Sequence, residues 1–214
     1  MAAHRVFLCA GRLFHVERHR LWLEIAESSP FPVPDTFVDR LELYRRWLLG
    51  EAMAAGGIGP GEADRVDIRH IADSLLFSLV MAPTDQVLDV GTGVGLPGVP
   101  LAILSPGTQF TLLDRSGRRV ELVRRVCRIL QLDNVTVVQG DVTEYTGSFA
   151  TVVARASIPP GELLGPLKSL VSPDGVAILG GSWAEEPLVA GYETKEIGSP
   201  FLDRSVWILM MRLT

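Results

Sequence analysis

The amino-acid sequence predicts a doubly wound, mostly parallel α/β sheet that follows a helical N-terminal segment. Three observations support this fold class. Short apolar runs recur about 15 to 26 residues apart, helical patterns separate most of them, and a glycine-rich loop follows the first run directly. Apolar strands that alternate with helices form a parallel sheet whose two faces are both covered.

Length and composition suit one α/β domain with an appendage. The chain has 214 residues, 47% hydrophobic and 21% charged, which excludes a disordered or fibrous chain. Two cysteines, Cys9 and Cys127, cannot build a disulfide framework and indicate a reducing compartment. No apolar run reaches the roughly 18 residues of a membrane span, and the run at 6–10 is too short for a secretory signal. We therefore expect a cytoplasmic protein.

Residues 1–83 are expected to form the helical N-terminal segment. Large apolar residues are mixed with Arg and His in residues 1–27, and the proline-rich stretch 28–35 ends that pattern because proline cannot continue a helix. An apolar stripe at helical spacing follows, made of Phe37, Leu41, Tyr44 and Leu48. A second helical pattern runs from about residue 62 to residue 81.

Residues 84–214 are expected to form the α/β core. The predicted strands are 86–90, 110–113, 135–138, 150–153 and 176–179. The predicted helices are about 98–104, 117–130 and 161–171. The tail, 193–213, offers one or two more strands, most clearly 206–209.

The strongest local signal is the glycine-rich segment 87–98, where a strand runs into a turn and then a helix. Glycines permit positive φ and let a ligand approach the backbone, and ligands of such sheets bind beyond the carboxyl ends of the strands. Residues 93–98 match the dinucleotide pattern G-x-G-x-x-G, with Asp114 about 20 residues further on for a ribose. A glycine turn that serves only helix–sheet packing is a further interpretation.

A second pattern, D-x-G-x-G-x-G from Asp89, resembles motif I of class I S-adenosylmethionine methyltransferases. This resemblance assigns Asp89 to the methionine ammonium, Asp114 to the ribose hydroxyls, and Asp141 with Val142 to the adenine. Acids at the ends of three successive strands suit a cationic cofactor better than a pyrophosphate. We therefore favour the methyltransferase, with NAD binding as the alternative.

A longer match extends from Asp89 to Ile103. It is similar to the signature D-x-G-[TS]-G-x-G-[FL]-P-G-[IV]-P-L-[AS]-I of the glucose-inhibited division protein B family, the bacterial 16S ribosomal RNA guanine-N7 methyltransferases. Four further segments resemble family motifs in family order: Arg69–Leu75, Thr111–Arg119, Ala154–Ala156 and Asp203–Arg204. The resemblance covers approximately residues 66–212.

The resemblance implies a class I, Rossmann-like fold and S-adenosyl-L-methionine as the cofactor. It assigns catalytic roles to Arg155 and Arg204, for which a structural ion pair is the alternative. The implied cofactor residues are Asp89, Gly91, Thr92, Gly93, Gly95, Leu96, Pro97, Gly98, Asp114, Arg115, Ser116, Asp141, Val142, Thr143 and Arg155. The implied partner is 16S rRNA or a precursor of the small ribosomal subunit. We expect a monomer without a membrane anchor, and the scattered histidines predict no metal site.

The chain departs from the family pattern on the substrate side. Trp47 is not followed by the family's Asn-Leu-Thr, and Gly180–Gly181 stands where the family carries Lys-Gly. Residues 140–143 stand where the family tends to carry R-x-E. A methyltransferase of a small molecule or of another RNA therefore stays an alternative, as does a non-catalytic nucleotide-binding protein.

Arginine supplies most of the positive charge of an acidic chain. The formal net charge is -5, and the 20 Lys+Arg include only two lysines, Lys168 and Lys195. Codon use in a GC-rich genome is one explanation. However, six arginines lie in one short segment: Arg115, Arg118, Arg119, Arg124, Arg125 and Arg128. This segment predicts either a phosphate-binding rim or a solvated helix face.

Overall fold

The computed structural model describes residues 10–155, 159–181, 186–198, 201–202, 204 and 206–212, with side chains of the first helix from Arg18 onward. Cys9, Ala156 and Asp203, which the sequence singled out, lie outside the described residues.

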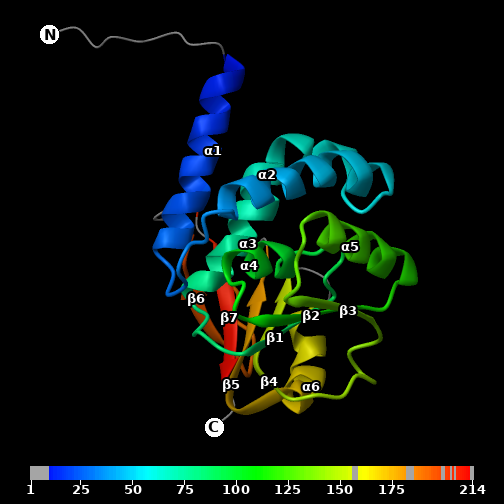
Figure 1. The fold of residues 1–214 in the computed structure, drawn as a ribbon. Helices are drawn as coiled ribbons and strands as arrows, with labels where there is room; N and C mark the ends of the chain where they lie inside the picture. Colours follow the sequence, from blue (N-terminus) through cyan, green and yellow to red (C-terminus); the bar gives the residue numbers. More distant parts are fainter. Residues whose placement is uncertain are drawn as a thin grey trace, which may run out of the picture.

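The described residues form one seven-stranded sheet in the order β3-β2-β1-β4-β5-β7-β6 (Figure 1). The strands are β1 Gln86–Val90, β2 Gln109–Asp114, β3 Val135–Gln139, β4 Phe149–Arg155, β5 Val171–Gly180, β6 Glu193–Glu196 and β7 Trp207–Arg212. The first five run parallel, whereas β7 pairs antiparallel with both β5 and β6. The expectation of a mostly parallel sheet is confirmed.

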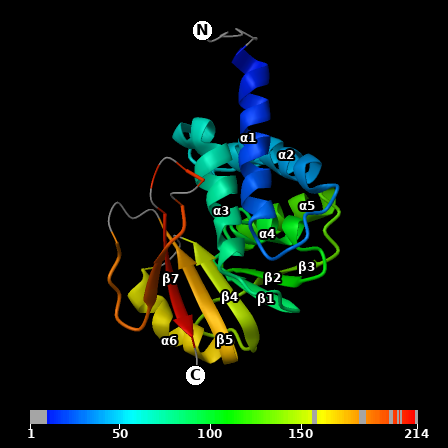
Figure 2. The ribbon, with the colours of Figure 1, turned by 90° about the vertical axis from the view of Figure 1, so that its left-hand side faces the viewer.

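Helices cover both faces of this sheet, as the continuous apolar strands require. On β1, Val87 belongs to one hydrophobic cluster and Leu88 to the other, because successive side chains of a strand point to opposite faces. Helices α4 (Gly98–Leu104) and α5 (Gly117–Ile129) lie on the first face, and α6 (Pro160–Leu170) lies on the second (Figures 1 and 2). The doubly wound arrangement is therefore also confirmed.

The N-terminal segment is helical, as expected. It comprises α1 Ala10–Glu27, α2 Phe37–Trp47, η1 Leu48–Ala52, η2 Pro60–Arg65, η3 Val66–Ala72, α3 Asp73–Leu75 and η4 Leu76–Leu79. From residue 60 to residue 79 the chain alternates between 3-10, π and α turns, a detail that periodicity does not predict. Its buried apolar residues belong to the same hydrophobic cluster as the first face of the sheet, which α4 and α5 cover. None of the described helices has the length and apolar character to cross a membrane.

A charged network fixes α1 and α2 against η3. Arg18 lies 3.1 Å from Glu42 and 3.7 Å from Asp67, and Arg45 also pairs with Asp67. The indole N–H of Trp22 donates to the backbone carbonyl of Asp67 at 3.1 Å. These contacts set the position of η3, which matters because η3 reaches the carboxyl end of the sheet.

Asn134, just before β3, ties the end of α4 to the sheet. Its buried side-chain amide donates to the carbonyls of Ala102, Ser105 and Thr108 at 3.0 to 3.1 Å. Buried carbonyls that lose a donor are costly.

We predict that Asn134→Ala lowers the free energy of unfolding by about 2 kcal/mol, because buried carbonyls lose their partner. Urea denaturation at neutral pH measures this loss. The control is Gln109→Ala, at an exposed position, which is expected to change the free energy of unfolding by less than about 0.5 kcal/mol. Equal losses in the two variants would contradict the role given to Asn134.

Candidate functional site

The glycine loop between β1 and α4 has the backbone geometry that its sequence predicts. Gly91, Gly93 and Gly95 have φ of 69°, 63° and 98°, a region that residues with a side chain rarely adopt. At Gly98, a Cβ would lie 2.6 Å from Asp89 Oδ2 and 2.3 Å from Leu112 Cδ2. Only glycine therefore lets α4 start this close to the strands.

Asp89, at the end of β1, lies beneath the loop and is fully buried. Its Oδ2 accepts hydrogen bonds from the Thr92 hydroxyl at 2.7 Å and the Gly98 N–H at 2.9 Å. Its Oδ1 is buried and accepts a hydrogen bond from no described residue. Burial raises the pKa of Asp89 to about 7, although both hydrogen bonds act in the opposite direction. Asp89 thus shapes the loop from below.

Asp114, at the end of β2, holds the loop from the side. Its Oδ2 accepts a hydrogen bond from the Gly93 N–H at 2.9 Å, and its Oδ1 accepts one from the Ser116 N–H at 2.8 Å. Arg119 Nη1 lies 3.8 Å from Oδ2. Asp114 therefore connects the loop to the first turn of α5.

A third carboxylate, Asp141, follows β3. Its Oδ1 accepts hydrogen bonds from the N–H of Thr143 at 3.0 Å and from the hydroxyl of the same residue at 2.8 Å. These two bonds lower the pKa of Asp141 below its usual value, so the side chain is a carboxylate at neutral pH.

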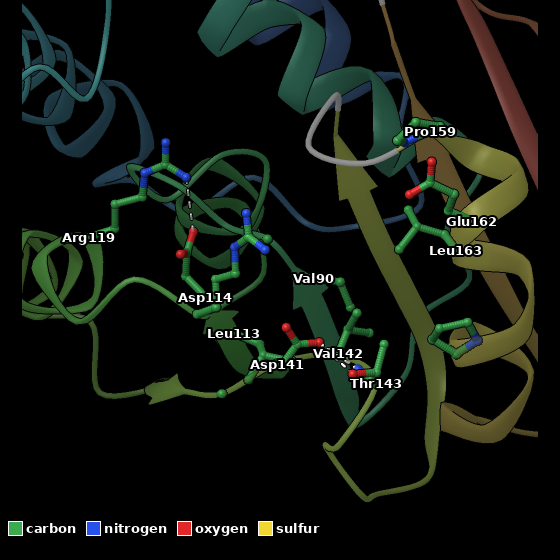
Figure 3. A pocket seen from close by; sticks show the side chains of 14 residues that line it. Val90, Leu113, Asp114, Arg119, Asp141, Val142, Thr143, Pro159, Glu162 and Leu163 are labelled. Atoms are coloured by element: carbon green, nitrogen blue, oxygen red, sulfur yellow. Dashed lines mark hydrogen bonds and ion pairs between the residues drawn. The ribbon is translucent and has the colours of Figure 1, made fainter.

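The ends of β1, β2 and β3 line a pocket of about 410 Å³, which α6 closes on one side (Figure 3). This volume lies in the range of sites for small molecules and cofactors. Six residues that the sequence assigned to the cofactor line it: Gly91, Asp114, Arg115, Asp141, Val142 and Thr143. The other assigned residues do not: Asp89, Thr92, Gly93, Gly95, Leu96, Pro97, Gly98, Ser116 and Arg155 are absent from its lining.

Helix α6 contributes pocket residues that sequence reasoning missed. Glu162, Leu163 and Pro166 line the pocket, with Pro159 just before the helix. Figure 3 shows Glu162 and Leu163 across the pocket from Asp114 and Asp141. The signal that was available is their position directly after the fourth strand, at the carboxyl edge of the sheet. Arg119, on α5, was assigned to a possible phosphate rim and also lines the pocket.

The two candidate catalytic arginines contact the N-terminal segment. Arg155, at the end of β4, donates from Nη1 to the carbonyl of Arg69 at 2.7 Å and from Nη2 to His70 Nδ1 at 3.2 Å. Arg204 donates from Nη2 to both carboxylate oxygens of Asp73, at 2.5 and 2.7 Å. Arg204 thus forms the ion pair that was expected as the alternative to a catalytic role. Both arginines hold η3 and α3 over the sheet edge.

His70 is mostly buried between Arg155 and Glu62. Burial and the neighbouring Arg155 charge lower the pKa of His70 to about 4, so the imidazole is neutral at pH 7. Because Arg155 donates to Nδ1, the ring proton belongs on Nε2, which lies 3.3 Å from a carboxylate oxygen of Glu62.

Gly180 stands where the family pattern carries lysine, and the structure shows what fills that space. A Cβ at Gly180 would lie 2.4 Å from Cζ of Phe77, on η4. The Phe77 ring, Arg155 and Asp73 line a small cavity of about 30 Å³ next to Gly180. A side chain at this position would require Phe77 to move.

Comparisons with known proteins identify the family of the chain. Residues 38–199 match the family model described as GidB: rRNA small subunit methyltransferase G. A relative from Mycolicibacterium smegmatis, named ribosomal RNA small subunit methyltransferase G, is 42% identical over 137 residues. That alignment covers 60% of this chain and 58% of the relative, so it spans somewhat more than half of the relative's length. A relative of the same name from Chlorobaculum tepidum is 36% identical, over 76% of this chain and 77% of its own length.

A solved structure shares the fold at low identity. The S-adenosylmethionine-dependent methyltransferase from Aquifex aeolicus has a TM-score of 0.55 and 15% identity, and the match covers 73% of this chain and 100% of that one. This likeness supports the class I fold alone. The family model, which matches well over half of the chain, shows more: the chain belongs to the GidB family, rRNA small subunit methyltransferase G.

Proposed function

We propose that this chain transfers a methyl group from S-adenosyl-L-methionine to N7 of a guanine in 16S ribosomal RNA. The observation that carries the proposal is the pocket in which Asp114 and Asp141 stand at neighbouring strand ends beside the glycine loop. Carboxylates placed there would repel the pyrophosphate of a dinucleotide, whereas they attract an adenosine that carries a cationic tail. Family membership supports the RNA as the substrate.

The pocket residues fit such a cofactor. Asp114 would accept the ribose hydroxyls, and Asp141 with Val142 would hold the edge of the adenine between the end of β3 and α6. The second carboxylate oxygen of Asp89 is buried and without a donor among the described residues, which suits a cationic group nearby. The cofactor supplies a methyl group already activated on a sulfonium.

The chain then contributes position and electrostatics rather than a base. Guanine N7 carries a lone pair and no proton, so in-line displacement at the methyl group needs only alignment. Arg155 can provide part of this alignment, because its hydrogen bonds to Arg69 and His70 use two of its five N–H groups. Nε is buried, so the second N–H of Nη1 and the second N–H of Nη2 are the groups that can donate to guanine O6 or to a phosphate. Arg204 would act through Asp73, as a positioning residue.

We predict that rRNA from a strain without this gene lacks one N7-methylguanine that the parent strain contains. Purified protein and S-adenosyl-L-methionine should restore that modification in rRNA or subunits from the deletion strain, read by mass-spectrometric mapping. Intact methylation in the deletion strain would contradict the RNA assignment. Cofactor binding without rRNA methylation would point to a small molecule or another RNA as the substrate.

We predict that Asp114→Asn weakens S-adenosyl-L-methionine binding at least about tenfold, because an amide accepts less well from ribose hydroxyls and from the Gly93 N–H. Arg155→Gln is the matched variant, since Arg155 lies outside the pocket lining and should leave cofactor affinity within about twofold while rRNA methylation falls. Isothermal calorimetry measures both affinities. Equal affinities in the two variants would contradict these assignments.

We predict a pH dependence of stability that originates at His70. Its pKa is about 4 in the folded chain and 6.5 in the unfolded chain, so unfolding takes up a proton between these values and stability falls as the pH decreases from 6.5 to 4. His70→Asn keeps an acceptor for Arg155 but does not titrate. Between pH 7 and pH 5, urea denaturation should show the parent losing about 2 kcal/mol more than this variant. Equal losses would show that His70 does not cause the effect.

A further inference from the structure

Six arginines begin at the rim of the 410 Å³ pocket, where Arg115 lies just before α5, and continue along α5 to its last turn. We call them the α5 stripe: Arg115, Arg118, Arg119, Arg124, Arg125 and Arg128. Arg115 and Arg119 line the pocket, and Arg128 lies in the last turn of the helix. At 1.5 Å per residue, the helical part of the stripe, from Arg118 to Arg128, extends for about 15 Å away from the pocket. In Figures 1 and 2, α5 lies at the side of the molecule, over β2 and β3.

The charges of this stripe are only partly neutralised within the chain. Arg119, Arg124 and Arg125 pair with Asp114, Glu121 and Glu51 at 3.8, 2.7 and 3.0 Å. Apart from Asp114, these side chains are largely solvent-exposed. Exposed ion pairs contribute only about 0 to 1 kcal/mol, so a phosphate can take the place of Glu121 or Glu51 as the partner of an arginine.

The other three arginines of the stripe, Arg115, Arg118 and Arg128, are exposed, and none forms an ion pair within the described part of the chain. The chain as a whole carries a net charge of -5, so this positive excess is local.

The far half of the stripe borders a groove. The end of α5 and the edge strand β3 line a hollow of about 400 Å³, with Arg124, Arg128, Gln131 and Asp133 among its residues. Arg124 is fixed there, because its Nη2 donates to the carbonyl of Val137 at 3.0 Å. Asp133 is the one acid in this lining, against two arginines.

We infer that the α5 stripe and this groove bind the sugar–phosphate backbone of the RNA whose base is methylated at the pocket. The inference rests on the proposed function and adds where the substrate lies. The guanidinium group matches the paired oxygens of a phosphate. An acidic protein partner fits less well, because a protein interface needs an apolar centre, and on α5 Ile129 is the only large exposed hydrophobic residue among those described.

The test compares two double variants that each remove two positive charges. Arg118→Gln/Arg128→Gln changes the stripe at residues outside the cofactor pocket. Lys168→Gln/Arg212→Gln is the control. Lys168 is exposed on α6, on the opposite face of the sheet. Arg212 is exposed at the end of β7, where it pairs with Val176 of β5. Thermal unfolding checks that both variants fold.

The measurement is the Kd for a 16S rRNA fragment over a range of salt concentrations, together with methyl transfer at saturating RNA. Each lost phosphate contact lowers the slope of log Kd against log salt by about 0.7 to 0.9. We therefore expect the slope of the stripe variant to fall by about 1.5 relative to the parent, with unchanged cofactor affinity and unchanged kcat. The control variant should keep the slope of the parent.

Other outcomes separate this inference from the proposed function. A stripe variant with the slope of the parent, or a control variant with the same reduced slope, would overturn the inference. So would a stripe variant that binds RNA normally but loses affinity for the protein part of the small subunit. A parent that binds rRNA through the stripe but transfers no methyl group to it would support the inference and contradict the proposed function.

Discussion

Two aspartates hold one glycine loop, Asp89 from below and Asp114 from the side, and they determine the shape of the site. Asp89 accepts the N–H of Gly98 and the hydroxyl of Thr92, and Asp114 accepts the N–H of Gly93. These bonds fix a loop whose glycines already need positive φ, and they bind it to two neighbouring strands. The position of α4, the start of α5 and the floor of the pocket all follow from this attachment.

The N-terminal segment packs against the glycine loop and the carboxyl edge of the sheet. The hydroxyl of Tyr44, on α2, donates to the Val94 carbonyl inside the loop at 2.9 Å. Arg155 and Arg204 connect η3 and α3 to the carboxyl edge of the sheet, and Phe77 packs where a side chain at position 180 would stand. In this chain the ring of Phe77 thus occupies the space beside Gly180, the position at which the family pattern has a lysine.

The sequence was sufficient for the strands, the glycine loop and the helices of the core, because apolar runs and glycines report local backbone and burial directly. It also assigned Asp114 and Asp141 to one site, because the carboxyl ends of parallel strands lie at the same edge of a sheet, and both residues line the same pocket. It did not predict Glu162 and Leu163 in the pocket lining, nor the contact of Arg155 with Arg69, 86 residues earlier. Such contacts depend on tertiary packing, which carries no local pattern.

A crystal structure of the complex with S-adenosylhomocysteine tests most directly whether these strand ends form the cofactor site. The proposed site predicts the ribose at Asp114 and the adenine between Asp141 and α6, within the 410 Å³ pocket. A product bound in the groove beside β3, or with its ribose away from Asp114, would contradict this assignment of the site.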